Sequence, residues 1–554
     1  MSIAAIPDPQ RTGGRIAEAR RDRGLTQRDL ARALGVSMHA VDRLETGAAD
    51  ATLHLPNIAD VTHRPPEWFV ESTPKTSGMV GVPHRHATSS TSLGVIGRNL
   101  VLGAVVLLVT IRFFTEFVPI LPRAANFVDI PIFLGLAAAA MVIPQRQERQ
   151  RRHYLFLGAP AVAFLGLCIL SAVANPGRVQ PGPALVFIYG FLAPVGVYAA
   201  AYCLWPAGNA RSLSRLLVVL GIVQLVVVLL IDLPRFIASG NPDVVSGTFG
   251  TNAYQLVFFL LIFTALLAGI FSVEPKRAAA RIAPLLIVAS FATILLAQYR
   301  ALLATTAVTL VVVGILLGRR ARGLAIGAAA VAAFAITFSY VVSNYPFLKL
   351  GSTATVLADD PRFYAGERLK AARPVSRLYE DKPLAAVLGT GPGTFSSRAW
   401  QTFAKAGSTS QSNVAGAYVL TLTGGTTYET DVSRTYVQSE LESGAIIEGS
   451  RAVTSPHSSY LALLAEVGVL GFALLVGIYV AATLRAGRIA IGLLRRPTRG
   501  DPLPALALGA TIAFLTLLQL GLLENWLEVT RVTFIAWVML AVVTKELDAR
   551  PARR

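Results

Sequence analysis

The segment NAYQLVFFLLIFTALLAGIFS spans residues 252–272 and contains no charged side chain. An α-helix rises 1.5 Å per residue, so about 20 apolar residues cross the ~30 Å hydrocarbon core of a bilayer. Similar apolar runs recur on both sides of this segment, and short, arginine-containing connectors separate them. The sequence therefore predicts an all-α, polytopic membrane protein.

The composition supports this prediction. Of the 554 residues, 53% are hydrophobic and 15% are charged, and the mean hydropathy is +0.56. Soluble domains carry about 25% charged residues, so a soluble enzyme, a collagenous protein and a disordered chain are excluded. The net charge of +18 does not require a nucleic-acid partner, because helix-flanking arginines supply it. Cys168 and Cys203 lie in apolar runs and are interpreted as packing residues.

The apolar runs predict about twelve transmembrane helices. The stretch 282–317 is interrupted by Gln298-Tyr299-Arg300, so we interpret it as a tight hairpin, since one helix of that length would overshoot the bilayer. The runs lie near residues 95–118, 126–143, 154–174, 183–204, 213–231, 252–272, 282–297, 301–317, 323–342, 458–484, 503–523 and 526–544.

Arginines predict the orientation, because cytoplasmic connectors are enriched in Lys and Arg. If residue 1 is cytoplasmic, the inner connectors hold several times more arginines than the outer ones. We therefore expect a multi-pass protein of the cell (inner) membrane with both termini in the cytoplasm. The expected regions are a helix-turn-helix domain at 1–70, a linker at 71–92, transmembrane helices 1–9 at 93–342, a large extracytoplasmic loop at 343–456, transmembrane helices 10–12 at 457–545 and a cytoplasmic tail at 546–554. Within the loop, alternation at 417–423 and 435–438 predicts a small β-hairpin.

Residues 14–70 carry the signature of three short helices separated by glycines. Thr26 is an expected N-cap, and Asp29 completes a capping box. The segment RRDRGLTQRDLARALGVSMHAVDRLETG (20–47) resembles the phage-repressor family of helix-turn-helix domains. In that family the third helix enters the major groove. The resemblance implies that the DNA-facing residues are Gln27, Ser37, His39 and Arg43. Docking to a cytoplasmic protein is the alternative, and the sequence favours neither.

Few residues on the predicted outer side carry chemistry. Arg300, between two apolar helices, suits bidentate contact with phosphate oxygens, and snorkelling to lipid head groups is the alternative. His457 precedes the tenth helix, where the helix N-terminus favours a neutral imidazole that accepts a proton. A structural role for this histidine is the alternative. Arg112 and Glu116 are expected to pair along one helix, and Arg531 has Glu528 nearby. The sequence contains no phosphate-binding loop, dinucleotide fingerprint or His/Cys metal cluster, so no cofactor and no metal are predicted.

Four segments resemble the O-antigen ligase and O-antigen polymerase superfamily. HSSYLALLAEVGVLG (457–471) has a histidine, a serine, nine residues, a glycine, two residues and a second glycine. The other three are GERLKAARPVSRLYEDKPLAAVLGTGPGTF (366–395), GTFGTNAYQLVFFLLIF (247–263) and AQYRALLATTAV (297–308). The amino-terminal helix-turn-helix departs from the usual layout of this superfamily.

This resemblance implies a glycosyltransferase that moves a glycan from a polyprenyl-diphosphate carrier to an acceptor glycan, lipid or protein at the outer leaflet. The reaction is implied to be metal-independent and inverting, with His457 as base and Arg300 as the main cation. The implied binding residues for diphosphate or glycan are Arg235, Arg368, Gly391, Gly393 and Arg531. Glu466 is interpreted as a buried structural acid. The alternatives are a polymerase of the same superfamily and a membrane-tethered DNA-binding regulator. A transporter is less favoured, because no inverted repeat is evident.

Overall fold

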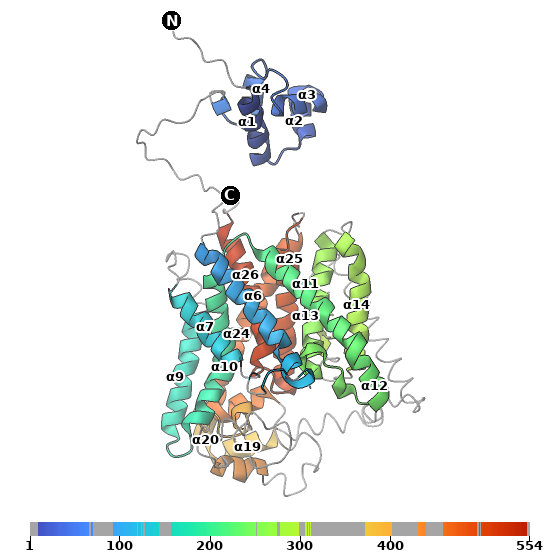
Figure 1. Ribbon diagram of the computed structural model, residues 1–554. Helices are drawn as coiled ribbons and strands as arrows, with labels where there is room; N and C mark the ends of the chain where they lie inside the picture. Colours follow the sequence, from blue (N-terminus) through green and yellow to red (C-terminus); the bar gives the residue numbers. More distant parts are fainter. Residues whose placement is uncertain are drawn as a thin grey trace. The chain divides into compact units, whose positions relative to one another are not determined.

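The computed structural model divides the chain into two compact units, Met1–Thr88 and Ser89–Arg554 (Figure 1). The structure describes residues 9–65, 68–69, 92–118, 120–122, 125, 128–142, 157–250, 252–273, 278–297, 305–306, 308–309, 311, 372–400, 430–438, 458–495, 498 and 500–550.

The first unit is a small helical domain. Its helices are α1 (Pro9–Asp22), α2 (Gln27–Leu34), α3 (Met38–Glu45) and α4 (Leu55–Thr62). The Thr26 hydroxyl accepts the Asp29 N–H, and the Asp29 carboxylate accepts the Thr26 N–H, which confirms the capping box. Leu30 and Val41 are fully buried between the helices. The three predicted helices are therefore present, and α4 adds a fourth that the glycine spacing did not indicate.

The second unit is all α in its described part. Its α-helices are α6 (Ser92–Arg112), α7 (Asp129–Val142), α9 (Ala159–Ala174), α10 (Pro181–Leu204), α11 (Ala210–Val227), α12 (Leu233–Ser239), α13 (Ala253–Val273), α14 (Ala278–Leu296), α19 (Arg373–Asp381), α20 (Pro383–Leu388), α24 (Ser459–Arg495), α25 (Leu503–Leu523) and α26 (Thr530–Ala549). Shorter π and 3-10 segments are η1 (Phe113–Phe117), η4 (Val228–Asp232), η5 (Pro242–Val244), η6 (Gly247–Phe249) and η10 (Ser433–Gln438).

Six helices in the described residues are long and apolar enough to cross a membrane, which makes this a multi-pass membrane protein. They are Leu93–Phe117, Pro181–Leu204, Ala210–Ser239, Ala253–Val273, Ser459–Arg495 and Leu503–Leu523. Three apolar helices are shorter: Asp129–Val142, Ala159–Ala174 and Ile282–Leu296. The expected helix at 323–342 lies outside the described residues, as does most of the one at 301–317.

The helices of the second unit run between two ends, which we name by what they carry. The loop end carries α19 and α20 (Figure 1). There Asn175 Nδ2 donates to the Gly389 carbonyl at 3.2 Å. The terminal end carries the start of α6 and the end of α26. There Tyr202 Oη donates to Asp548 at 2.9 Å, and Arg550 pairs with Asp501 at 2.7 Å. Successive long helices therefore alternate in direction, as the predicted topology requires.

The core of the bundle combines large aromatic rings with close helix contacts. The Trp537 ring, fully buried, lies 4.7 Å from the Phe514 ring and 5.5 Å from the Tyr479 ring, centroid to centroid. At the α13–α25 contact, a Cβ on Gly269 would lie 2.5 Å from the Ala505 Cα. Small residues let membrane helices approach this closely. Close packing then stabilises the helix contact, because the hydrophobic effect does not drive helices together within lipid.

Two local predictions were wrong. Thr435–Gln438, expected to be a β-strand, form part of the π-helical turn η10, where Tyr436 Oη donates to Asp381 of α19 at 3.0 Å. A four-residue alternation is too short to separate strand from helix. The other half of the expected hairpin, 417–423, lies outside the described residues. The predicted helix 213–231 leaves Arg235 in an outer loop, but Arg235 lies in α12, because α11 continues through η4 to Ser239.

Candidate functional site: an arginine cluster at the loop end

The glycine-rich segment 388–395 forms a turn that only glycine accommodates. Gly389, Gly391 and Gly393 have φ values of 75°, 110° and 74°. A Cβ on Gly391 would lie 2.2 Å from Val179 Cγ2, and one on Gly393 would lie 2.7 Å from the Pro183 carbonyl carbon. Side chains other than hydrogen are therefore excluded by conformation and by contact. The turn packs directly on the start of α10.

The same turn packs on a break in α24. Gly468 interrupts this helix with a φ of 68°, and a Cβ there would lie 2.2 Å from the Val387 carbonyl oxygen. The Thr390 N–H donates to the Ala465 carbonyl at 2.9 Å, and the Gly391 N–H donates to the Glu466 carbonyl at 3.0 Å. The structure thus brings together the two glycine-containing segments that the sequence resemblance singled out.

Glu466 lies at the centre of this contact and is fully buried. Its carboxylate accepts hydrogen bonds from the backbone N–H groups of the described segment that follows the glycines. These donors are Gly393, Phe395 at 3.0 Å, and Ser396 and Ser397 at 2.9 Å each. A buried carboxylate is tolerated when its oxygens are fully hydrogen-bonded. The expected burial of Glu466 is therefore confirmed, and its structural role stays a prediction.

Glu528, in the connection between α25 and α26, holds the next part of the same segment. Its Oε2 accepts the Arg398 N–H at 2.7 Å, while Oε1 is buried without a hydrogen-bond partner in the described part of the chain. Burial first, and then the nearby Glu466 charge, raise the pKa of Glu528 to about 8, although Arg398 opposes the shift. Glu528 therefore holds a proton near neutral pH.

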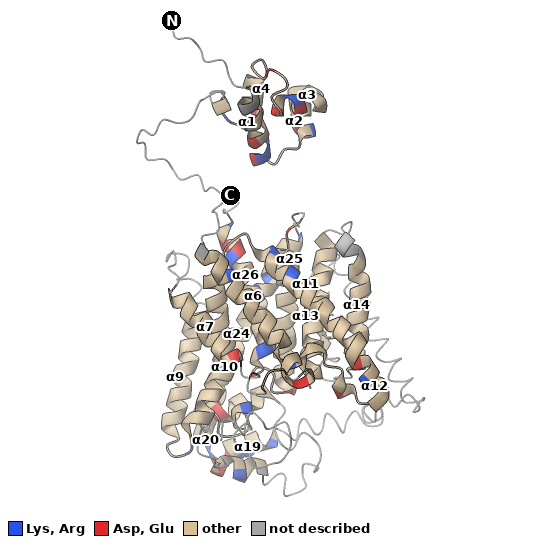
Figure 2. Ribbon diagram, in the orientation of Figure 1, with Lys and Arg blue, Asp and Glu red and all other residues tan. Residues whose placement is uncertain are grey.

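Three arginines converge beside these acids, and we call Arg112, Arg398 and Arg531 the arginine cluster. Arg531 is the second residue of α26 and is only 6% exposed. It interacts electrostatically with Arg112 at the end of α6 and with Tyr254 at the start of α13. The Arg398 side chain hydrogen-bonds the same Tyr254. Charged residues are sparse along the helices, and a few lie near the lower end of α6 (Figure 2).

Acidic side chains only partly compensate the arginine cluster. Arg112 pairs with Glu116 at 3.7 Å, which confirms the expected pair along this helix. Arg531 is within electrostatic range of Asp129 and Glu116. In the described residues, no hydrogen bond or ion pair joins Arg531 to Glu528, and Arg531 Nη1 and Arg112 Nε are buried without acceptors. Guanidinium groups in this state suit a bidentate oxyanion such as phosphate.

The predicted site residues divide between this cluster and parts of the chain outside it. Arg531 belongs to the cluster, and Gly391 and Gly393 lie in the turn that leads to Arg398. Arg235 is exposed on α12, with its guanidinium carbon 4.6 Å from the Phe117 ring centroid. His457, Arg300 and Arg368 lie outside the described residues.

The sequence reasoning missed Arg398, Tyr254 and Asp129 as site residues. Arg398 lies three residues after Phe395, the last residue of the glycine-rich segment. Asp129 is the first residue of an apolar helix. A signal was available for Tyr254 and Asp129, because each lies where a predicted apolar run meets the predicted outer side, whereas Arg398 lies within the predicted loop 343–456. Charges at such positions are costly and indicate function.

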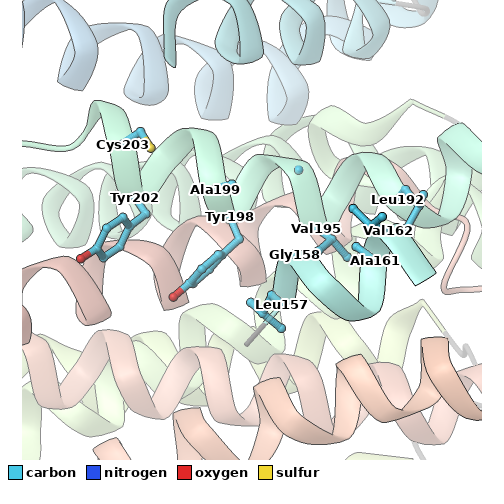
Figure 3. Close-up of a pocket in the computed structure, with 11 residues that line it drawn as sticks. Leu157, Gly158, Ala161, Val162, Leu192, Val195, Tyr198, Ala199, Tyr202 and Cys203 are labelled. Atoms are coloured by element: carbon cyan, nitrogen blue, oxygen red, sulfur yellow. The ribbon is translucent and has the colours of Figure 1, made fainter. Parts of the chain in front are cut away.

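Other candidate sites are weaker. No group of three or more His, Cys, Asp or Glu residues in the described ranges is placed to hold a metal ion. A groove of about 220 Å³ between α9 and α10 is lined by Leu157, Val195 and Tyr198, among others (Figure 3). Its lining contains no charged side chain, so a phosphate-bearing group has no partner there.

In the first unit, the predicted DNA-facing residues have distinct roles. Ser37 caps α3 by accepting the Ala40 N–H at 3.1 Å, and His39 is exposed. Gln27 Nε2 donates to Glu45 at 2.9 Å, which ties it to the domain core. Arg43 is exposed and donates to the Ala48 carbonyl at 3.2 Å. His39 and Arg43 are thus the two most available to a partner.

Comparison with known proteins identifies only this first unit. Residues 12–59 match the helix-turn-helix domain family. No curated protein matches the chain. The chain therefore combines an amino-terminal helix-turn-helix domain with an all-α, multi-pass membrane unit.

Proposed function

We propose that the membrane unit is a glycosyltransferase that uses a polyprenyl-diphosphate-linked glycan, as ligases and polymerases of the O-antigen superfamily do. The observation that carries this proposal is the arginine cluster at the loop end, two of whose guanidinium groups have buried nitrogens without acceptors in the described part of the chain. A diphosphate presents paired oxyanions, which is what convergent arginines bind best. The superfamily resemblance supports the same substrate class.

The expected topology places this site at the outer leaflet. In the proposal, about twelve helices cross the membrane, the terminal end faces the cytoplasm and the loop end faces outward. Arg211 and Arg550 at the terminal end fit this orientation, because cytoplasmic ends are enriched in arginine. A lipid-linked donor then reaches the cluster laterally, with its diphosphate at the depth of the helix ends.

The chemistry is a single inverting displacement. The acceptor oxygen attacks the anomeric carbon, the bond from that carbon to the diphosphate oxygen breaks, and the hydroxyl proton passes to His457. The products are the glycosylated acceptor and the polyprenyl diphosphate, whose negative charge the arginines stabilise as it develops. Ser458, the residue after His457, is buried at the loop end, where its hydroxyl donates to the Gly521 carbonyl at 3.1 Å.

Transfer in reconstituted vesicles tests this proposal. Purified full-length protein is supplied with a polyprenyl-diphosphate oligosaccharide and an acceptor glycolipid, and product is followed by mass spectrometry. We expect Arg531→Gln and His457→Ala to lose at least about 100-fold in rate, the usual cost of removing a charge-stabilising or proton-accepting group. Arg178→Gln is the matched control, because Arg178 lies at the same end and pairs with Asp431 outside the cluster at 3.0 Å. Wild-type rates in both site variants would contradict the proposal.

A second function is proposed for the first unit, which we infer binds DNA. The match of residues 12–59 to the helix-turn-helix family and the exposure of Arg28, Arg32 and Arg43 favour it. Full-length protein in nanodiscs is titrated with duplex DNA over a salt series. Each phosphate contact contributes about one unit to the slope of log affinity against log salt, so Arg43→Gln is expected to flatten it. A slope near zero in the wild type would contradict DNA binding and favour protein docking.

A further inference from the structure

Two buried acids accept the backbone N–H groups of one short segment. Glu466 of α24 accepts the N–H groups of Gly393, Phe395, Ser396 and Ser397. Glu528, before α26, accepts the Arg398 N–H at 2.7 Å and also the Ala399 N–H. Every backbone N–H from 393 to 399 except that of Thr394 therefore donates to the side chain of one of these two acids.

This arrangement is costly unless the segment is held in place. Glu466 is 0% exposed and Glu528 is 8% exposed, and the two are close enough to repel when both are ionised. Removing two neighbouring acids from water is unfavourable. The backbone N–H groups offset that cost only while residues 393–399 keep this conformation. Burial of the two acids therefore depends on the conformation of residues 393–399, and that conformation depends on the two acids.

The segment leads directly into the arginine cluster. Arg398 receives its backbone anchor from Glu528 and sends its side chain to Tyr254, which also interacts with Arg112. The other two arginines need no such device, because Arg112 and Arg531 are fixed on helices α6 and α26. Arg398 is the first of the helical residues 398–400, and it directly follows the non-helical residues 391–397, most of which the two acids hold through their backbone N–H groups.

We propose that Glu466 and Glu528 are positioning residues whose side-chain carboxyl groups jointly fix residues 393–399 and so direct the Arg398 guanidinium toward Arg112 and Arg531. This inference rests on the proposed function for the ligand, a diphosphate. The two acids hold residues 393–399 whether or not a diphosphate binds, so this part of the inference has a separate test.

Amide hydrogen exchange of the full-length protein in nanodiscs tests the fixing. Glu466→Gln and Glu528→Gln keep the side-chain size but replace one oxygen with an NH2 donor, so N–H groups of the segment lose acceptors. We expect exchange in 393–399 to rise by about tenfold or more in each variant, because local opening becomes easier. Unchanged exchange there in both variants would overturn the inference.

Glu546→Gln is the matched control. Glu546 is another buried acid, and it accepts the backbone N–H groups of Gly208 at 2.7 Å and of Asn209 and Ala210 at 2.8 Å each. Its substitution breaks an equivalent set of hydrogen bonds at the terminal end. Exchange should rise at 208–210 and stay unchanged at 393–399. A rise at 393–399 in this control would show a general loosening of the bundle and contradict a specific role for Glu466 and Glu528.

A double-mutant cycle tests whether the acids act through Arg398. Inorganic pyrophosphate is the probe, and its dissociation constant is measured for wild type, Glu466→Gln, Arg398→Gln and the double variant. If Glu466 acts through Arg398, Glu466→Gln alone should weaken pyrophosphate binding about tenfold. When Arg398 is already replaced, the same substitution should weaken binding by less than about twofold. Equal losses in both backgrounds would overturn the positioning role. Failure of the wild type to bind pyrophosphate would overturn the proposed function, while raised exchange would still establish the fixing.

Discussion

The Thr530 hydroxyl donates a hydrogen bond of 2.8 Å to the Asp129 carboxylate, across 401 residues of sequence. The same Asp129 oxygen accepts from Tyr189 at 3.2 Å. Asp129 therefore joins the starts of α7 and α26 to α10 and lies in the field of Arg531, the residue after Thr530. This contact fixes the most deeply buried member of the arginine cluster.

We expect Asp129→Ala to destabilise the membrane unit by about 1–3 kcal/mol, because buried hydroxyl donors lose their acceptor. The free energy of unfolding is measured by urea titration in detergent. In a double-mutant cycle with Thr530→Val, the second substitution should cost clearly less when Asp129 is already absent. Fully additive costs would show that the Asp129–Thr530 contact contributes nothing to stability.

Gly468→Ala is expected to destabilise the protein by roughly 1–3 kcal/mol, the range for a non-glycine residue held in a strained conformation. The added methyl group meets the Val387 carbonyl oxygen, and the φ of 68° is unfavourable for alanine. Gly477→Ala in the same helix is the matched control. A Cβ at Gly477 meets no atom within 4 Å, and alanine favours the helix by about 1 kcal/mol. Equal thermal stability of the two variants would refute the close approach at Gly468.

The raised pKa of Glu528 predicts a pH dependence of stability. Its folded-state pKa of about 8 exceeds the ordinary value of 4.5. The folded chain then binds one more proton than the unfolded chain between these values, so this contribution to stability is full below pH 4.5 and is lost as pH rises to about 8.

Glu528→Gln should flatten the fall in unfolding free energy between pH 5 and pH 8, since glutamine does not titrate. Measurement at pH 5, where both side chains are uncharged in the folded state, separates any loss of packing from the effect of ionisation. A slope identical to that of the wild type would show that Glu528 does not titrate as proposed.

Glu45 anchors the helix-turn-helix domain. It pairs with Arg20, and it also accepts from Gln27 at 2.9 Å. Burial opposes its ionisation, but hydrogen bonds from Arg20 and Gln27 outweigh burial and lower its pKa. Its contribution to stability is therefore present above the unfolded pKa and is lost as pH falls through the lowered folded value.

Glu45→Gln is expected to cost the domain about 1–3 kcal/mol at pH 7, because hydrogen bonds to charged groups are the stronger kind. Amide exchange of α1 and α3 in the full-length protein measures the change. Glu18→Gln, at an exposed position on α1, should leave that exchange unchanged. Equal protection in both variants would contradict the anchoring role.

The sequence by itself determined the class of fold, because the length of an apolar run is a local quantity set by bilayer thickness. The stretch 252–272 was predicted within one residue of each end of α13, and the Thr26–Asp29 capping box was predicted from four adjacent positions. The Arg112–Glu116 pair was likewise local, since positions four apart share one helix face.

Only the tertiary structure decided which polar residues meet. Gly393 and Glu466 lie 73 residues apart, and no pattern within either segment indicates that the carboxylate of one accepts the N–H of the other. Arg112, Arg398 and Arg531 come from three distant segments. Arg112 ends α6 and Arg531 begins α26, and the two interact, while Arg398 joins them through Glu528 and through Tyr254 at the start of α13. Periodicity reports which face of a helix is apolar, whereas the neighbour of that face is set by the packing of the whole bundle.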